Sequence, residues 1–85
     1  MNEKILIVDD EPRVARLVSE VLTAVGYRVI AAGSAKTAIE KVALEQPELV
    51  LLDILLPPGM DGYQVCAHIR EFSDVPVIML TAKAR

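Results

Sequence analysis

The stretch Lys4-Ile5-Leu6-Ile7-Val8-Asp9-Asp10 decides the fold of this chain. A short apolar run rich in β-branched residues ends abruptly in two carboxylates. A run of this length without alternation predicts a strand that is buried on both faces, as in a parallel sheet. The carboxylates that follow it would lie at the carboxyl edge of the sheet, where open parallel sheets bind their ligands.

The same kind of apolar run returns three times, at residues 27–32, 48–52 and 75–80. Between the runs lie three helical patterns, each with a start or stop signal. The first has Pro12 at its start, an apolar stripe at helical spacing and Gly26 after its end. Ser34 caps the second and Pro47 stops it, while Asp61 and Gln64 form a capping-box pattern at the third. The stripes are Val14, Leu17, Val18, Val21, Leu22 and Val25; then Ala35, Ala38, Ile39, Val42 and Ala43; then Val65, Ile69 and Phe72.

Strands and helices therefore alternate, from the first strand to the fourth. This order predicts an α/β fold in which helices cover both faces of a parallel sheet through right-handed crossovers. We expect three layers, helix on sheet on helix, with four strands and three helices.

Length and composition allow one small domain over residues 1–85. The chain is 53% hydrophobic with a net charge of −3, which excludes intrinsic disorder and disfavours direct nucleic-acid binding. A lone Cys66 excludes a disulfide framework. No apolar run is long enough to span a bilayer, and no signal-peptide pattern begins the chain, so we expect a cytoplasmic protein without membrane contact.

Three carboxylates and one hydroxyl follow the predicted strands: Asp9, Asp10, Asp53 and Thr81. If the first and third strands are neighbours, about 4.8 Å apart, the carboxylates share one pocket and at least one of their pKa values rises. A hard divalent cation would relieve the repulsion, and Mg²⁺ suits an all-oxygen site. The simpler alternative is that Asp9 and Asp10 only cap the first helix, but that role does not explain Asp53.

A carboxylate beside Mg²⁺ can act as a nucleophile toward a phosphoryl group and form an aspartyl phosphate. The hydroxyl of Thr81 and the backbone N–H of Ala82 could bind a further phosphoryl oxygen. Phosphoryl acceptance is therefore the chemistry that these residues favour.

Four segments in this order resemble the receiver domain of two-component response regulators. They are ILIVDDE (5–11), ELVLLDILLP (48–57), GMDGYQVCAHIR (59–70) and VPVIMLTA (75–82). The resemblance implies a flavodoxin-like parallel sheet of order 2-1-3-4-5 and phosphoryl transfer from a sensor histidine kinase.

The resemblance also implies a role for each matching residue. Asp53 would be the phospho-acceptor and, with Asp10 and the backbone carbonyl of Leu55, a ligand of Mg²⁺. Asp9 would act at the metal through water or in support. Thr81 would contact the phosphoryl group and report phosphorylation by its side-chain position.

Two departures from the family pattern stand out. Pro57-Pro58 adds one residue to the loop after Asp53, and either X-Pro bond could be cis. The family's last third, with its fifth strand, last two helices and lysine, has no match here, and Lys83 does not replace that lysine. We therefore expect an incomplete sheet of order 2-1-3-4 whose fourth strand is an exposed edge that promotes self-association.

Other functions remain open at this point. The chain could be a non-catalytic interaction or oligomerisation module that uses its exposed fourth strand. A metal-dependent phosphohydrolase would want a second acid two residues after the nucleophile, where Leu55 stands instead. His68, a conceivable phosphodonor, is expected to be a solvated residue on the surface of the third helix.

Overall fold

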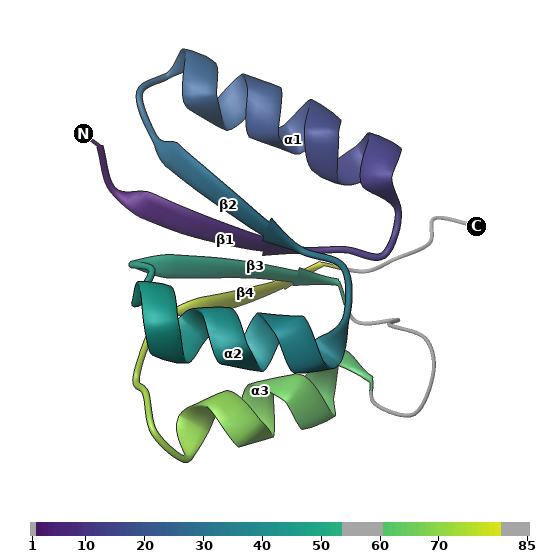
Figure 1. Ribbon diagram of the computed structural model, residues 1–85, viewed down its shortest axis with the longest axis vertical. Helices are drawn as coiled ribbons and strands as arrows, with labels where there is room; N and C mark the ends of the chain where they lie inside the picture. The colour runs from purple at the N-terminus through teal and green to yellow at the C-terminus, as the bar shows by residue number, and fades with distance from the viewer. Residues whose placement is uncertain (1, 54–60, 81–85) are drawn as a thin grey trace.

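The computed structural model describes residues 2–53 and 61–80. Within these ranges, strands and helices alternate along the chain as the sequence predicts (Figure 1). The elements are β1 (Lys4–Val8), α1 (Pro12–Ala24), β2 (Arg28–Ala32), α2 (Ala35–Glu45), β3 (Leu49–Asp53), α3 (Gly62–Arg70) and β4 (Val77–Leu80).

The strands form one parallel sheet in the order β2-β1-β3-β4. This is the order that the resemblance to receiver domains implies for the first four strands. Strand β1 lies between β2 and β3, with Leu6 beside Val50 and Val8 beside Leu52. The chain direction is the same in all four strands, so the carboxyl ends of β1 and β3 meet at one edge of the sheet.

The main core lies between the sheet and the layer formed by α2 and α3, whereas α1 covers the opposite face (Figure 1). Alternate residues of each strand point into this core, and the helices contribute one apolar side each. Its buried members are Leu6, Val8, Ala32, Ala35, Ala38, Val42, Val50, Leu52, Val65, Ile69 and Val75.

Local signals fix the ends of the helices. The Ser34 hydroxyl accepts the backbone N–H of Thr37 at 3.2 Å. Asp61 Oδ1 accepts the N–H of Gln64, and Gln64 Oε1 accepts the N–H of Asp61, both at 2.9 Å, which completes the predicted capping box. Gly26, after α1, has a φ of 105°, a left-handed conformation that favours glycine at a helix stop.

The predicted stripe of α1 is only partly covered. Ala15 is buried and Val18 and Leu22 are half-buried, but Val14, Leu17, Val21 and Val25 are exposed. The reason is that α1 lies on β1 and β2 and meets the sheet with one flank of its stripe.

Phe72 was expected to face inward and is exposed, so that prediction is wrong. The third helix ends at Arg70, and Phe72 therefore falls outside the helical spacing that placed it beside Val65 and Ile69. Ala43, the last residue of the predicted stripe of α2, is also exposed. The remaining differences are small shifts of strand ends: β2 begins at Arg28 and β4 at Val77, and Asp53 belongs to β3 itself.

We expect Leu52→Ala to lower the free energy of unfolding by about 3 kcal/mol, because it opens a cavity in the fully buried centre of the sheet. Leu44, which is 82% exposed on α2, gives the matched control. Leu44→Ala should change stability by no more than about 0.5 kcal/mol. Urea unfolding followed by circular dichroism measures both, and equal losses would contradict the core described above.

Candidate functional site

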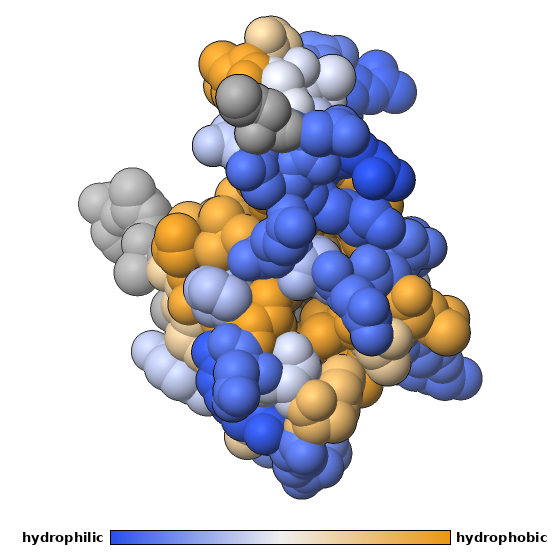
Figure 2. All heavy atoms as spheres, turned by 90° about the vertical axis from the view of Figure 1, so that its left-hand side faces the viewer, coloured by the Kyte–Doolittle hydropathy of each residue, from blue (hydrophilic) through white to orange (hydrophobic). Residues whose placement is uncertain are grey.

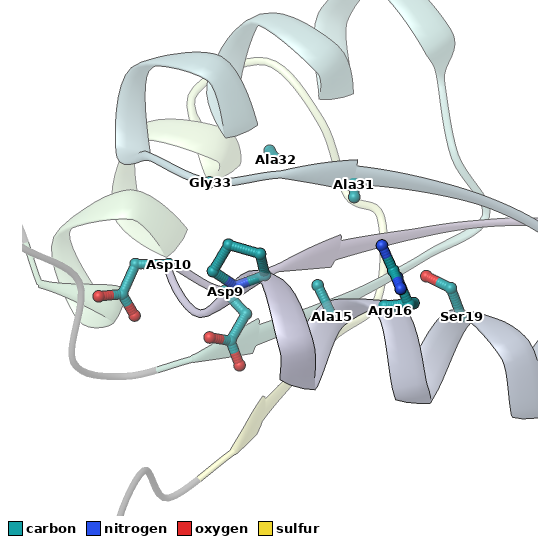
Figure 3. Close-up of a pocket in the computed structure, with 9 residues that line it drawn as sticks. Asp9, Asp10, Ala15, Arg16, Ser19, Ala31, Ala32 and Gly33 are labelled. Atoms are coloured by element: carbon teal, nitrogen blue, oxygen red, sulfur yellow. The ribbon is translucent and has the colours of Figure 1, made fainter.

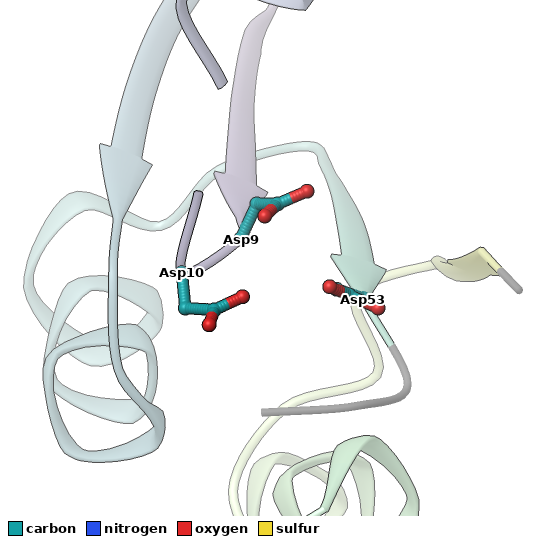
Figure 4. Close-up of side chains that lie close together, drawn as sticks. All are labelled: Asp9, Asp10 and Asp53. Carbon is teal, nitrogen blue, oxygen red and sulfur yellow. The ribbon is translucent and has the colours of Figure 1, made fainter. Parts of the chain in front are cut away.

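Three carboxylates meet at the carboxyl edge of the sheet (Figure 4). Asp9 and Asp10 directly follow β1, and Asp53 is the last residue of β3. The two strands are register neighbours up to Val8 and Leu52, so the residues that follow must come close. The expected convergence of these side chains is confirmed.

One carboxylate oxygen from each residue can be chosen so that all three atoms lie within 4.8 Å of one another. Their surroundings differ. Asp53 is a buried charged residue, 8% exposed, whereas Asp9 is half-buried and Asp10 is exposed. We call these three carboxylates the acidic cup; Asp53 is its most buried member, and Asp10 is open to solvent.

Burial raises the pKa of Asp9, and the neighbouring charges of Asp53, Asp10 and Glu11 raise it further. The backbone N–H of Glu11 opposes this effect by donating a 2.8 Å hydrogen bond to Asp9 Oδ1. The sequence predicted that crowding would raise at least one pKa, and Asp9 is that residue. Three negative charges at this site repel one another, and a bound cation would reduce that repulsion.

The donor atoms suit a hard divalent cation. Carboxylate oxygens are the ligands that Mg²⁺ prefers, and it commonly takes one or two of them together with several waters. Clusters of exposed acids are common without a metal, but here one member is almost completely buried. Together the three side chains offer a set of oxygen ligands of the kind that a divalent cation takes.

The alternative that Asp9 and Asp10 only cap α1 is not sufficient. The N-cap residue of α1 is Glu11, and its side chain makes no capping hydrogen bond. Asp9 does accept the Glu11 N–H, so it helps to shape the turn into the helix. That turn role explains neither the direction of Asp10 nor the burial of Asp53.

Several predicted site residues fall outside the described ranges. Leu55, Thr81 and Ala82 belong to segments 54–60 and 81–85, as do Pro57-Pro58 and Lys83. Their roles stay predictions. In the described part of β4, Leu80 is the register partner of Asp53, so the strand that precedes Thr81 ends beside the acidic cup.

A pocket of about 360 Å³ opens between α1 and the end of β2, next to the carboxylates (Figure 3). Arg16 and Ser19 line it from α1, opposite the backbone of residues 31–33. No pattern in the sequence predicts this pocket. In the sequence, Arg16 and Ser19 indicate only a polar side of a helix. The opposite wall of the pocket is the end of β2, which is distant in sequence.

Comparisons with known proteins agree with this geometry. A family model described as "Response regulator receiver domain" matches residues 5–85. A probable transcriptional regulator, ycf27, from Pyropia yezoensis is 49% identical over 81 residues, which are 95% of this chain and 33% of the relative. The DNA-binding response regulator MtrA from Mycolicibacterium smegmatis is 43% identical over 83 residues, 98% of this chain and 36% of MtrA. The chain thus spans about a third of the length of these relatives.

A solved structure is also similar. The response regulator protein TrrA from Thermotoga maritima, in complex with Mg²⁺-BeF, has a TM-score of 0.87 and 37% sequence identity. The match covers 96% of this chain and 71% of that one.

None of the helices in residues 2–53 and 61–80 is long and apolar enough to cross a bilayer. The cytoplasmic location expected from the sequence stays a prediction.

We expect Asp9→Asn to stabilise the fold at pH 7 in the absence of divalent cations, by up to about 1 kcal/mol. The substitution removes a repelled charge and keeps an oxygen that can accept the Glu11 N–H. Because the pKa of Asp9 is raised on folding, the folded chain binds more protons between the unfolded and folded pKa values. The contribution of protonated Asp9 to the free energy of unfolding is therefore fully present below the unfolded aspartate pKa of about 3.9. It is lost as the pH rises through the folded pKa.

Urea unfolding of both chains from pH 3 to pH 8, at low salt with a chelator, measures this difference. It should be near zero at pH 3 and grow as the pH rises. Asp74→Asn, at an exposed position outside the cup, is the control. A wild-type chain that is more stable than Asp9→Asn at pH 7 would contradict the electrostatic interpretation.

Proposed function

This chain belongs to the response regulator receiver domain family, and we propose that Asp53 accepts a phosphoryl group from a sensor histidine kinase with the help of Mg²⁺. The observation that carries the proposal is the convergence of Asp9, Asp10 and Asp53 at the adjoining ends of β1 and β3. The burial of Asp53 singles it out as the acceptor, because a shielded carboxylate is less hydrated and a stronger nucleophile.

In the proposed step, one carboxylate oxygen of Asp53 forms a bond to the phosphorus of a phosphohistidine on the kinase. The bond between that phosphorus and the histidine nitrogen breaks, and the nitrogen keeps the electron pair and takes up a proton. The product is an aspartyl phosphate on this chain and a free histidine on the kinase. No oxidant or further co-reactant is needed.

The residues fit a metal at the cup. Asp10 and Asp53 would be direct ligands, the Leu55 carbonyl a backbone ligand, and Asp9 would act through water or in support. When bound, Mg²⁺ supplies positive charge against the oxygens of the phosphoryl group. The Mg²⁺-BeF complex of TrrA, a similar protein, supports this assignment.

Thr81 and Ala82 complete the proposed site. We propose that the Thr81 hydroxyl and the Ala82 backbone N–H bind a phosphoryl oxygen, and that Thr81 changes position with phosphorylation. The support is the register of the sheet, in which Leu80 at the end of β4 lies beside Asp53.

The kinase would approach the open side of the cup, next to the start of α1. Arg13, with an almost fully exposed side chain, and Glu20 give this helix a charged outer surface. Complementary charges on a partner would orient it and speed its association. We propose this surface as part of the kinase contact.

We expect incubation with Mg²⁺ and a small phosphodonor such as acetyl phosphate to add one phosphoryl group to the chain. Asp53→Asn should abolish the addition, and a chelator should do the same. Asp74→Asn, an equivalent change at an exposed carboxylate elsewhere, should label as the wild type does. Intact-protein mass spectrometry measures the product.

Labelling that survives Asp53→Asn would contradict the choice of acceptor. If neither this chain nor a longer protein that carries it is labelled, the phospho-acceptor function is wrong.

A second candidate function is an interaction module that pairs through the edge of β4. Among the described strands, β4 pairs only with β3, and both Ile78 and Leu80 are exposed. An unpaired parallel edge is a template for another strand. We expect amide hydrogen exchange in Val77–Leu80 to slow as protein concentration rises if this edge pairs between copies. Concentration-independent exchange would contradict it.

A further inference from the structure

Strand β2 forms the edge of the sheet opposite β4, and among the described strands it pairs only with β1. In the strand order 2-1-3-4-5 of the family, a fifth strand joins at β4, so β2 remains an edge. An open edge strand presents unpaired backbone groups to which a strand of another chain can bond. Protection of β2 must therefore come from side chains near this edge.

The register shows which backbone groups of β2 face outward. The Arg28 N–H and the Ala32 carbonyl both bond toward the chain of β1, at 2.9 and 3.1 Å. Successive residues of a strand direct their backbone groups to opposite sides. The N–H and carbonyl groups of Val29 and Ala31 therefore point away from the sheet, and an added strand would use these groups.

Lys41 occupies one of these outward groups. Its ammonium reaches from α2 and donates a 2.9 Å hydrogen bond to the Ala31 carbonyl oxygen. Lys41 is half-buried, whereas Lys36 on the same helix is exposed. Hydrogen bonds from a charged donor are stronger than those between neutral groups. A strand that paired with β2 would have to displace this ammonium from an acceptor that the pairing needs.

Further positive charges lie near the same edge. Arg28 is exposed within β2, and Arg16 lines the pocket between α1 and the end of β2 (Figure 3). Glu45 also lies near this edge, but its carboxylate already pairs with Lys4 Nζ at 3.0 Å. A second copy that approached through β2 would bring its own cations against these, and like charges that face each other destabilise strand pairing.

We propose that Lys41 keeps the β2 edge closed to strand addition, and that loss of its ammonium lets β2 pair with β2 of a second copy. In an antiparallel pair around a two-fold axis, Val29 of one copy would lie opposite Ala31 of the other. The outward N–H and carbonyl groups of both residues would then all have partners. With Lys41 in place, the Ala31 carbonyl is not free for this pair.

This contact does not depend on phosphoryl transfer, since it involves none of the three carboxylates. Other surfaces of the chain also offer routes to self-association. They are the β4 edge and the hydrophobic side chains that reach the surface where the strands begin (Figure 2), among them Phe72 beside a pocket of about 220 Å³. Neither route brings a partner to Val29 and Ala31, so exchange of these two amide hydrogens identifies the β2 edge.

The test compares three variants with the wild type: Lys41→Met, which removes the ammonium and keeps an unbranched side chain, Lys41→Arg, which keeps a cationic donor, and Lys36→Met. The last is the matched control, because it removes the same charge from an exposed position of α2. Sedimentation equilibrium measures self-association. Lys41→Met should lower the dimer Kd by at least about 10-fold, whereas Lys41→Arg and Lys36→Met should behave as the wild type does.

Residue-resolved amide exchange then locates the contact. In Lys41→Met, the amides of Val29 and Ala31 should exchange at least about 10-fold more slowly at high than at low protein concentration. The Ile30 amide, which faces β1, is the internal reference. Circular dichroism checks that each variant is folded, and Lys41→Gln replaces Lys41→Met if that variant is not.

Three results would each overturn the proposal. The first is a Lys41→Met chain that associates no more strongly than the wild type. The second is association that leaves the exchange of the Val29 and Ala31 amides unchanged. The third is an equal gain in association from Lys36→Met or Lys41→Arg, since the gain would then not come from the bond to Ala31.

Discussion

The parallel contact between β1 and β3 is the constraint on which the rest of this molecule depends. Leu6 and Val8 lie beside Val50 and Leu52, and all four are buried against α2 and α3. Hydrophobic burial therefore determines the register, and the register determines which residues meet at the carboxyl edge. The acidic cup is a consequence of that register, since three carboxylates would not approach one another on their own.

The three carboxylates differ in how deeply they are buried. Asp53 belongs to a strand of the core and is shielded, whereas Asp10 stands beyond the end of β1 and meets solvent. Asp9 lies between them, and its partial burial, together with the neighbouring charges, raises its pKa. Three residues of one chemical type thus differ in their exposure to solvent because they lie at different distances from the same core.

Much of this arrangement could be read from the sequence, because it rests on local signals. The run from Ile5 to Val8 specifies a buried strand, and the capping residues Ser34 and Asp61 specify helix starts. The alternation of these elements predicts a parallel sheet, and the resemblance to receiver domains implies the strand order in which β1 and β3 are neighbours. The convergence of the carboxylates then follows without knowledge of any side-chain position.

What the sequence could not specify depends on contacts between distant segments. The apolar stripe of α1 gives the direction of the helix face, but not how much of it the sheet covers. The pocket beside Arg16 needs the end of β2 as its second wall. Phe72 follows the apolar spacing of α3 in sequence, yet the helix ends two residues earlier. For α1 and for the pocket, the missing information is the position of a neighbouring segment; for Phe72, the local pattern itself was wrong, because the helix ends before it.

The hydrogen bond from the Glu11 N–H to Asp9 connects the start of α1 to the acidic cup. Glu11 is the residue from which α1 begins, and Asp9 is part of the acidic cup. A change in the charge of that carboxylate alters the strength of the bond that anchors the helix entrance. The charge of Asp9 and the stability of the turn into α1 are therefore thermodynamically linked, so a bound cation that changes the charge balance of the cup also changes the stability of that turn.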